Sequence, residues 1–130
     1  MKRIFIGFAT LSLASAAHAA PIEGRWKNPK NSVVVEVARC GNAYCGEVTK
    51  ATAKSKADAR QGGTKNLVGT RLMSGFIPDG KGGFKGKVLL PKRGIHATGT
   101  IRQAGNDTML VKGCALAGMV CKEQRWTRVN

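Results

Sequence analysis

The sequence has few acidic residues, few histidines and few aromatic side chains. Of its 130 residues only 7 are Asp or Glu and 2 are His, and aromatic residues make up 5% of the chain. Scattered acids and a single histidine beyond residue 20, His96, leave little material for an acid–base pair, a catalytic triad or a metal centre. We therefore expect no catalytic residues, no metal site and no cofactor, and a protein that is not an enzyme.

The shortage of aromatic residues also argues against nucleic acid as a partner. Single-stranded nucleic acid is usually bound by several aromatic side chains that lie on one basic face. Only Phe84, which is flanked by Lys81 on one side and by Lys85 and Lys87 on the other, fits that arrangement even loosely. The sequence therefore disfavours nucleic-acid binding.

Residues 1–19 have the composition of a cleaved export signal. Two basic residues precede the apolar run 4–17, and Ala-His-Ala at 17–19 supplies small residues at the two positions that signal peptidase reads. We expect cleavage after Ala19, with cleavage after Ala20 or an uncleaved anchor as alternatives, and a periplasmic or secreted location. No later segment reaches the ~20 apolar residues of a membrane-spanning helix.

The remaining segment, residues 20–130, has the length of a single domain. Without the leader, 20 basic residues stand against 7 acidic ones, which gives a net charge of +13. A field of this sign attracts anions of any kind, including anionic lipid and lipopolysaccharide. The alternative is that the charge serves only solubility, as in many exported proteins.

Runs of strand-forming residues alternate with turn residues along this domain. In segments 33–38, 84–90 and 95–102, apolar residues recur at every second position. About eight such runs joined by short turns require antiparallel neighbours, and closing them into a barrel removes exposed strand edges. The expected fold class is all-β, a single antiparallel up-and-down barrel of about eight strands, with a β-sandwich as the alternative.

One segment interrupts the strand pattern. Residues 52–65 have no apolar period, and 54–61 is compatible with two helical turns ended by Gly62-Gly63. We therefore expect one longer loop that holds a short helix. Its basic side chains are candidates for contact with an anion: Lys54, Lys56, Arg60 and Lys65.

The even number of cysteines in the exported part predicts two disulfides. Chain entropy favours long-range pairs, because a short loop contributes only about 2 kcal/mol and a long one over about 4 kcal/mol. Each local pair, however, encloses a turn between two strands, so its Cα atoms approach bonding distance. We predict the local pairs Cys40–Cys45 and Cys114–Cys121.

Several motifs along the chain resemble one bacterial family. Gly-x-Trp stands at 24–26, Val-Val-Val-Glu-Val at 33–37, Cys-Gly-x-x-x-Cys-Gly at 40–46 and Trp-Thr-Arg at 126–128. Over nearly all of the expected exported part, the chain resembles the bacterial envelope family known as domain of unknown function 2147. The resemblance implies a small antiparallel barrel of lipocalin-like shape, and it implies no established activity.

The resemblance also suggests a plug at one barrel end. The opening Gly-x-Trp and a late Arg are similar to lipocalins, in which the Trp closes the barrel, and Trp26 and Arg128 match this pattern. The chain departs from the family in having His96 where a Tyr is usual, and in the basic loop 54–65 where the family has an acidic loop with Asn-Pro. A basic loop shifts the expected ligand towards anions.

Two functions of different classes follow. The first is a non-catalytic barrel that binds a small apolar or amphipathic anionic ligand, since eight strands leave room for one small molecule, with a barrel filled by its own side chains as the alternative. Inward apolar residues that would line such a cavity are Val35, Val37, Phe84, Val88 and Ile101. The second is a peripheral cell-envelope module that docks on anionic lipid or lipopolysaccharide through its basic surface. The sequence leaves the ligand and the oligomeric state undetermined.

Overall fold

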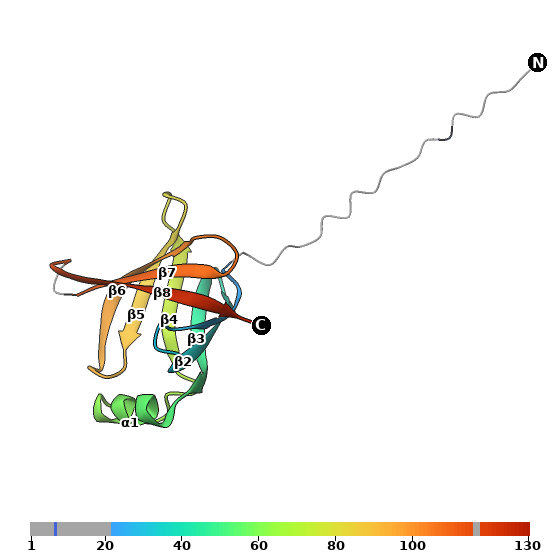
Figure 1. Cartoon of the computed structure of the whole chain (residues 1–130). Coiled ribbons are helices and arrows are strands. Elements are labelled where there is room, and N and C mark those ends of the chain that lie inside the picture. The colour runs from blue at the N-terminus through green and yellow to red at the C-terminus, as the bar shows by residue number, and fades with distance from the viewer. Residues whose placement is uncertain (1–6, 8–21, 116–117) are drawn as a thin grey trace, which may run out of the picture.

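Eight antiparallel strands close into one barrel in the order of the sequence (Figure 1). The computed structural model describes Gly7 and residues 22–115 and 118–130, so the expected leader and its cleavage site, apart from Gly7, lie outside the described residues. The predicted up-and-down barrel is confirmed. The strands are β1 (Gly24–Lys27), β2 (Val33–Cys40), β3 (Ala43–Ala51), β4 (Arg71–Pro78), β5 (Phe84–Leu90), β6 (Ile95–Gln103), β7 (Thr108–Ala115) and β8 (Val120–Val129).

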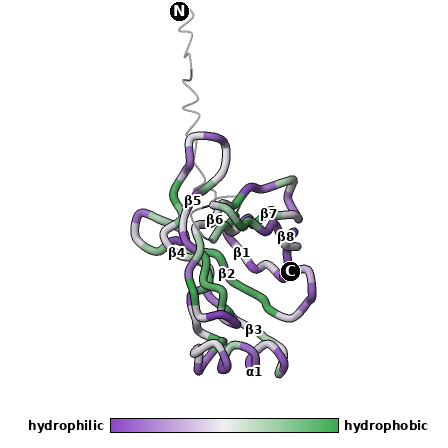
Figure 2. The backbone as a smooth tube through the Cα atoms, turned by 90° about the vertical axis from the view of Figure 1, so that its left-hand side faces the viewer, coloured by the Kyte–Doolittle hydropathy of each residue, from purple (hydrophilic) through white to green (hydrophobic). Residues whose placement is uncertain are grey.

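The alternation of apolar and polar residues decides which side of each strand faces the interior. In β2, Val33, Val35 and Val37 are buried, whereas Glu36 between them is exposed. The register continues this pattern across the sheet, because Phe84 of β5 lies opposite the buried Ile101 of β6. Figure 2 shows β2 as a largely hydrophobic stretch, while α1 carries many hydrophilic residues.

The helix α1 (Ala53–Gln61) occupies the loop between β3 and β4, as the sequence predicts. The Thr52 side chain caps it by accepting a hydrogen bond of 3.2 Å from the Ser55 amide. Gly62 at its other end packs on the β5–β6 turn so tightly that a Cβ there would lie 1.9 Å from the Pro91 carbonyl oxygen. This contact holds α1 below one end of the barrel (Figure 1).

Strand β4 begins later than the sequence indicates. Strand character resumes in the sequence at Asn66, but the structure forms a turn over 66–70 and starts β4 at Arg71. Two backbone hydrogen bonds explain the turn: Thr70 donates to Leu67, and Gly69 donates to Val48 of β3. Gly69 has a φ of 92°, which favours glycine.

Both disulfides close hairpins, as predicted from the turns that they enclose. Cys40–Cys45 joins β2 to β3 with its Cα atoms 5.8 Å apart, and Cys114–Cys121 joins β7 to β8. No free cysteine occurs among the residues that the structure describes.

Inward-facing glycines make room for large side chains inside the barrel. A Cβ at Gly46 would lie 3.1 Å from the Met73 sulfur, and one at Gly86 would lie 2.8 Å from the Phe76 ring. A Cβ at Gly99 would lie 2.4 Å from Val88 Cγ2. Phe76 is fully buried between these positions. Over this part of the barrel, the protein's own side chains fill the interior.

Two glycines that face each other across β6 and β7 test this packing. Gly99 pairs with Gly113, yet a Cβ at Gly113 would meet nothing within 4 Å. Overpacking a filled core costs about 1–3 kcal/mol, so we expect Gly99→Ala to lower the free energy of unfolding by that amount. Gly113→Ala is the matched control and should change it by less than about 0.5 kcal/mol. Urea unfolding of both variants provides the measurement, and equal midpoints would contradict the packed interior.

Candidate functional site

Trp26 and Arg128, which the sequence pairs as a plug, lie in direct contact at one end of the barrel. The Arg128 Cζ atom lies 4.2 Å from the centre of the Trp26 ring. Arg128 donates hydrogen bonds to the carbonyls of Glu23 at 2.8 Å and Asn106 at 2.7 Å. The Trp26 indole donates to the Ile22 carbonyl at 2.9 Å, and the ring is 0% exposed. The guanidinium thus covers the ring and ties it to two loops.

The residues predicted to line a ligand cavity belong to the packed core or lie against it. Val35, Val37 and Ile101 are buried in one cluster with Trp26. Phe84 and Val88 are partly buried against that cluster. Phe84 also meets the Tyr44 ring edge-on, with ring centres 5.4 Å apart. The structure therefore brings these five residues together.

Two recesses of the described surface lie elsewhere. One, of about 490 Å³, lies on the outside of β4, β5 and β6 and includes the Lys85 and Lys87 side chains. The other, of about 320 Å³, lies beside the β1–β2 turn and the start of α1. None of the five predicted cavity residues lines either recess.

Basic side chains gather at the barrel end opposite the plug. Because the strands run up and down, the β1–β2 turn, the α1 segment and the β5–β6 turn all lie at this end. We call residues 28–32, 52–70 and 91–94 the cationic end. It carries a single acid, Asp58. Its seven bases are all exposed: Lys30, Lys54, Lys56, Arg60, Lys65, Lys92 and Arg93.

The environment of Asp58 shows that bases from separate turns converge. Lys54 donates a hydrogen bond of 2.9 Å to the Asp58 carboxylate and is the main reason that the pKa of this carboxyl lies below 3.8. Lys92 and Lys30, which lie on two other turns, lower the same pKa further through their charge. Desolvation opposes these effects. The four residues predicted for anion contact, Lys54, Lys56, Arg60 and Lys65, therefore share this end with Lys30 and Lys92.

Beside the cationic end lie exposed apolar residues whose exposure the sequence does not predict. Ile95 continues the apolar alternation of segment 95–102, which places it on the inward side of its strand, yet it is 42% exposed. Val120 and Met119, at the β7–β8 turn, are 54% and 86% exposed. Alternation along a strand predicts the side that a residue faces, but it does not show where the neighbouring wall of the barrel ends. No sequence signal marks these residues as a surface feature.

His96 is exposed on the outer side of β6, opposite Leu89. The described residues contain no group of three or more His, Cys, Asp or Glu side chains that is suited to a metal ion. Among helices of the described chain, none has the length and hydropathy needed to cross a membrane.

Comparison with known proteins agrees with the geometry. A family model described as "Uncharacterized protein conserved in bacteria" (DUF2147) matches residues 24–128. A comparison with curated proteins gives no match. A solved structure of protein HP1028 from Helicobacter pylori, described as belonging to the lipocalin family, is similar with a TM-score of 0.66 and 17% identity. The alignment covers 86% of this chain and 85% of that protein, and it shows a lipocalin-like fold.

Removal of the Arg128 guanidinium tests the plug. Arg128→Met keeps the apolar length of the side chain but loses the ring contact and both carbonyl bonds. We expect the free energy of unfolding to fall by about 2–4 kcal/mol, measured by urea denaturation. Arg125→Met is the matched control, since Arg125 is exposed on the same strand, and it should cost less than about 0.5 kcal/mol. Equal losses in the two variants would count against the plug.

The Lys54–Asp58 pair generates a prediction about pH. A carboxyl with a lowered pKa keeps its ion pair above its unfolded value and loses it as the pH falls through the folded pKa. By NMR titration, we expect Asp58 to titrate below 3.8, and Lys54→Gln to move its pKa upwards. Asp79 is the internal control, because the backbone amides of Lys81 and Gly83 lower its pKa. A shift at Asp79 as large as that at Asp58 would contradict the assignment.

Proposed function

This chain belongs to the bacterial family of uncharacterized proteins known as domain of unknown function 2147, and we propose that it is an exported, non-catalytic barrel that docks on anionic surfaces of the cell envelope. The observation that carries the proposal is the cationic end, where seven exposed bases stand against one acid. That acid is already paired with Lys54. Six further bases form no ion pair with it, and they outnumber the single acid of these segments.

The bases of α1 and those of the β5–β6 turn form one surface, because α1 is held firmly against that turn. The close packing of Gly62 on the β5–β6 turn holds α1 beside Lys92 and Arg93. A base near an anionic lipid surface contributes about 1 kcal/mol, and the attraction extends over about a Debye length. Several bases at one barrel end therefore add their contributions and support binding to an anionic surface, which a single lysine would not give. Anionic phospholipid and the phosphates of lipopolysaccharide both offer the charge that this surface requires.

The two disulfides support export of the protein from the cytosol. Two disulfides persist in oxidising compartments and are rare in the bacterial cytosol. We place the protein in the periplasm, where the anionic faces of the membranes are within reach. The two basic residues and the apolar run before residue 18 support this location.

A ligand held inside the barrel is the second candidate. The lipocalin-like fold is consistent with small-ligand binding, and the open space beside Gly113 favours it. The tight packing around Gly86 and Gly99 favours the surface function instead. Native mass spectrometry of protein purified from periplasm distinguishes the two, since a bound small molecule would add its mass to that of the exported chain. Only the bare mass is expected from a barrel that acts through its surface.

Neutralising the cationic end should weaken binding to anionic vesicles. We expect the triple variant Lys56→Gln, Arg60→Gln, Lys65→Gln to bind phosphatidylglycerol-containing vesicles at least about tenfold more weakly than the unmodified protein. Binding of the unmodified protein should fall between about 0.1 M and 1 M salt, because the Debye length shrinks from about 10 Å to 3 Å. Co-sedimentation with vesicles measures both effects.

A second triple variant controls for net charge. Arg25→Gln, Lys81→Gln, Arg125→Gln removes the same charge from exposed positions outside the cationic end. It should retain most of the binding, because its changes lie away from the proposed contact. Equal weakening by the two variants, or no binding of the unmodified protein, would overturn the proposal that the cationic end is the docking surface.

A further inference from the structure

Besides Val68, which is 43% exposed within the cationic end, the described residues include three exposed apolar side chains beside that end. Ile95 begins β6 and lies opposite Leu90, directly after the basic turn of Lys92 and Arg93. Val120 begins β8 opposite Ala115, and Met119 precedes it. We call Ile95, Met119 and Val120 the apolar rim. They come from two different turns but lie at the same barrel end.

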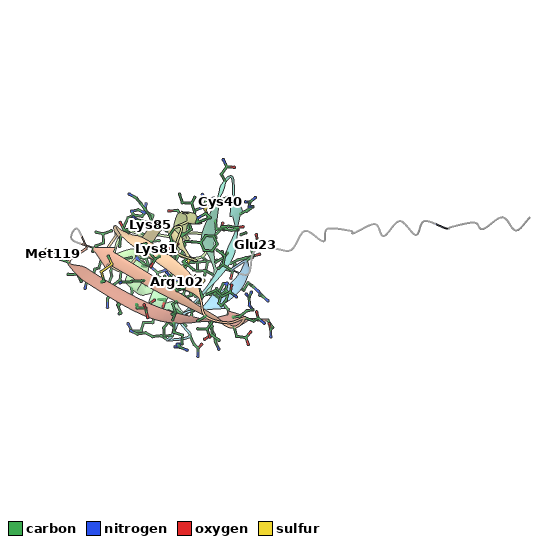
Figure 3. All side chains as sticks on the ribbon, turned by 90° about the horizontal axis from the view of Figure 1, so that it is seen from above. Glu23, Cys40, Lys81, Lys85, Arg102 and Met119 are labelled. Atoms are coloured by element: carbon green, nitrogen blue, oxygen red, sulfur yellow. A yellow bond between two sulfur atoms is a disulfide. The ribbon has the colours of Figure 1, made fainter. Side chains whose placement is uncertain are left out.

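Met119 of the apolar rim lies at an extremity of the barrel (Figure 3). In Figure 1 the β7–β8 hairpin extends past the barrel to the left, on the side where the β5–β6 turn lies, with α1 below. Figure 3 shows Met119 at the far end of the molecule from Glu23. Bulky side chains at a protruding tip are therefore accessible to a flat partner.

Apolar residues next to bases suit one kind of partner best. A bilayer interface offers anionic headgroups outside and acyl chains a few ångströms deeper, and peripheral proteins match it with bases beside apolar side chains. Lys122 follows the tip in β8 and is also exposed. A purely ionic partner, such as a polyphosphate, would leave Met119 and Val120 in water.

We infer that the apolar rim inserts into the interface of an anionic lipid bilayer while the cationic end binds the headgroups. This inference rests on the proposed function and narrows the anionic surface to a membrane. Charge attracts the protein from a distance, and burial of the rim then adds contacts that salt does not screen. Binding should therefore have a salt-sensitive part and a salt-resistant part.

A tryptophan placed at the tip reports insertion directly. The two native tryptophans are buried, at 0% and 6% exposed, so they give a steady background. Met119→Trp should show a blue-shifted emission, and quenching by brominated lipid, when phosphatidylglycerol-containing vesicles are added. Ile77→Trp is the matched control, because Ile77 is 53% exposed on β4 near the plug. It should show neither change.

Polar substitution of the rim separates this inference from the proposed function. The double variant Met119→Ser, Val120→Ser should lose about tenfold in vesicle binding at about 1 M salt, and Ile77→Ser should lose none. Both variants should bind inorganic polyphosphate as the unmodified protein does. If vesicle binding depends on the cationic end but Met119→Trp shows no spectral shift, the inference fails and the proposed function stands. If no anionic vesicle is bound at all, the proposed function fails.

The alternative to a membrane is that the apolar rim binds a second copy of the chain. Sedimentation velocity without lipid should show one species whose mass is unchanged by Met119→Ser, Val120→Ser. A dimer that this double variant dissociates would assign the rim to self-association and overturn the membrane inference.

Discussion

The contact between Trp26 and Arg128 lies at the seam where the first and last strands pair and close the barrel. Strand β1 has only four residues, and three residue pairs join it to β8, with Trp26 opposite Arg128. Without β1, strands β2 and β8 would present unpaired edges. The guanidinium covers the indole and binds the carbonyls of Glu23 and Asn106. One cation therefore joins the first strand, the last strand and two loops.

Closure determines what the interior can do. Phe76 and Met73 fill space that Gly46, Gly86 and Gly99 leave free, so much of the barrel is occupied by its own side chains. A lipocalin-like shape does not by itself imply a lipocalin-like cavity, because residue size on the inner wall decides how much volume remains. In this chain the interior around Phe76 is filled, whereas the barrel end opposite the plug displays exposed bases.

The topology also brings basic residues from separate connections to the same end of the barrel. In an up-and-down barrel every second connection lies at the same end, so bases that are distant in the sequence come together there. Lys30 and Lys92 both act on Asp58, although α1 lies between them in the sequence. In the proposed membrane contact, long-range attraction by the bases and short-range burial of the apolar rim would be complementary, since salt screens the first and does not screen the second.

The sequence by itself determined the features that local patterns encode. Period-two alternation set the strand faces, Gly62 marked the end of α1, and the turns enclosed by Cys40–Cys45 and Cys114–Cys121 paired the cysteines. Tertiary structure decided the rest. The turn before β4 depends on the bond from Gly69 to Val48, the exposure of Ile95 depends on where the barrel wall ends, and the cationic end depends on the packing of α1 on a distant turn. Each depends on how distant segments are placed relative to one another, which no local pattern of residues records.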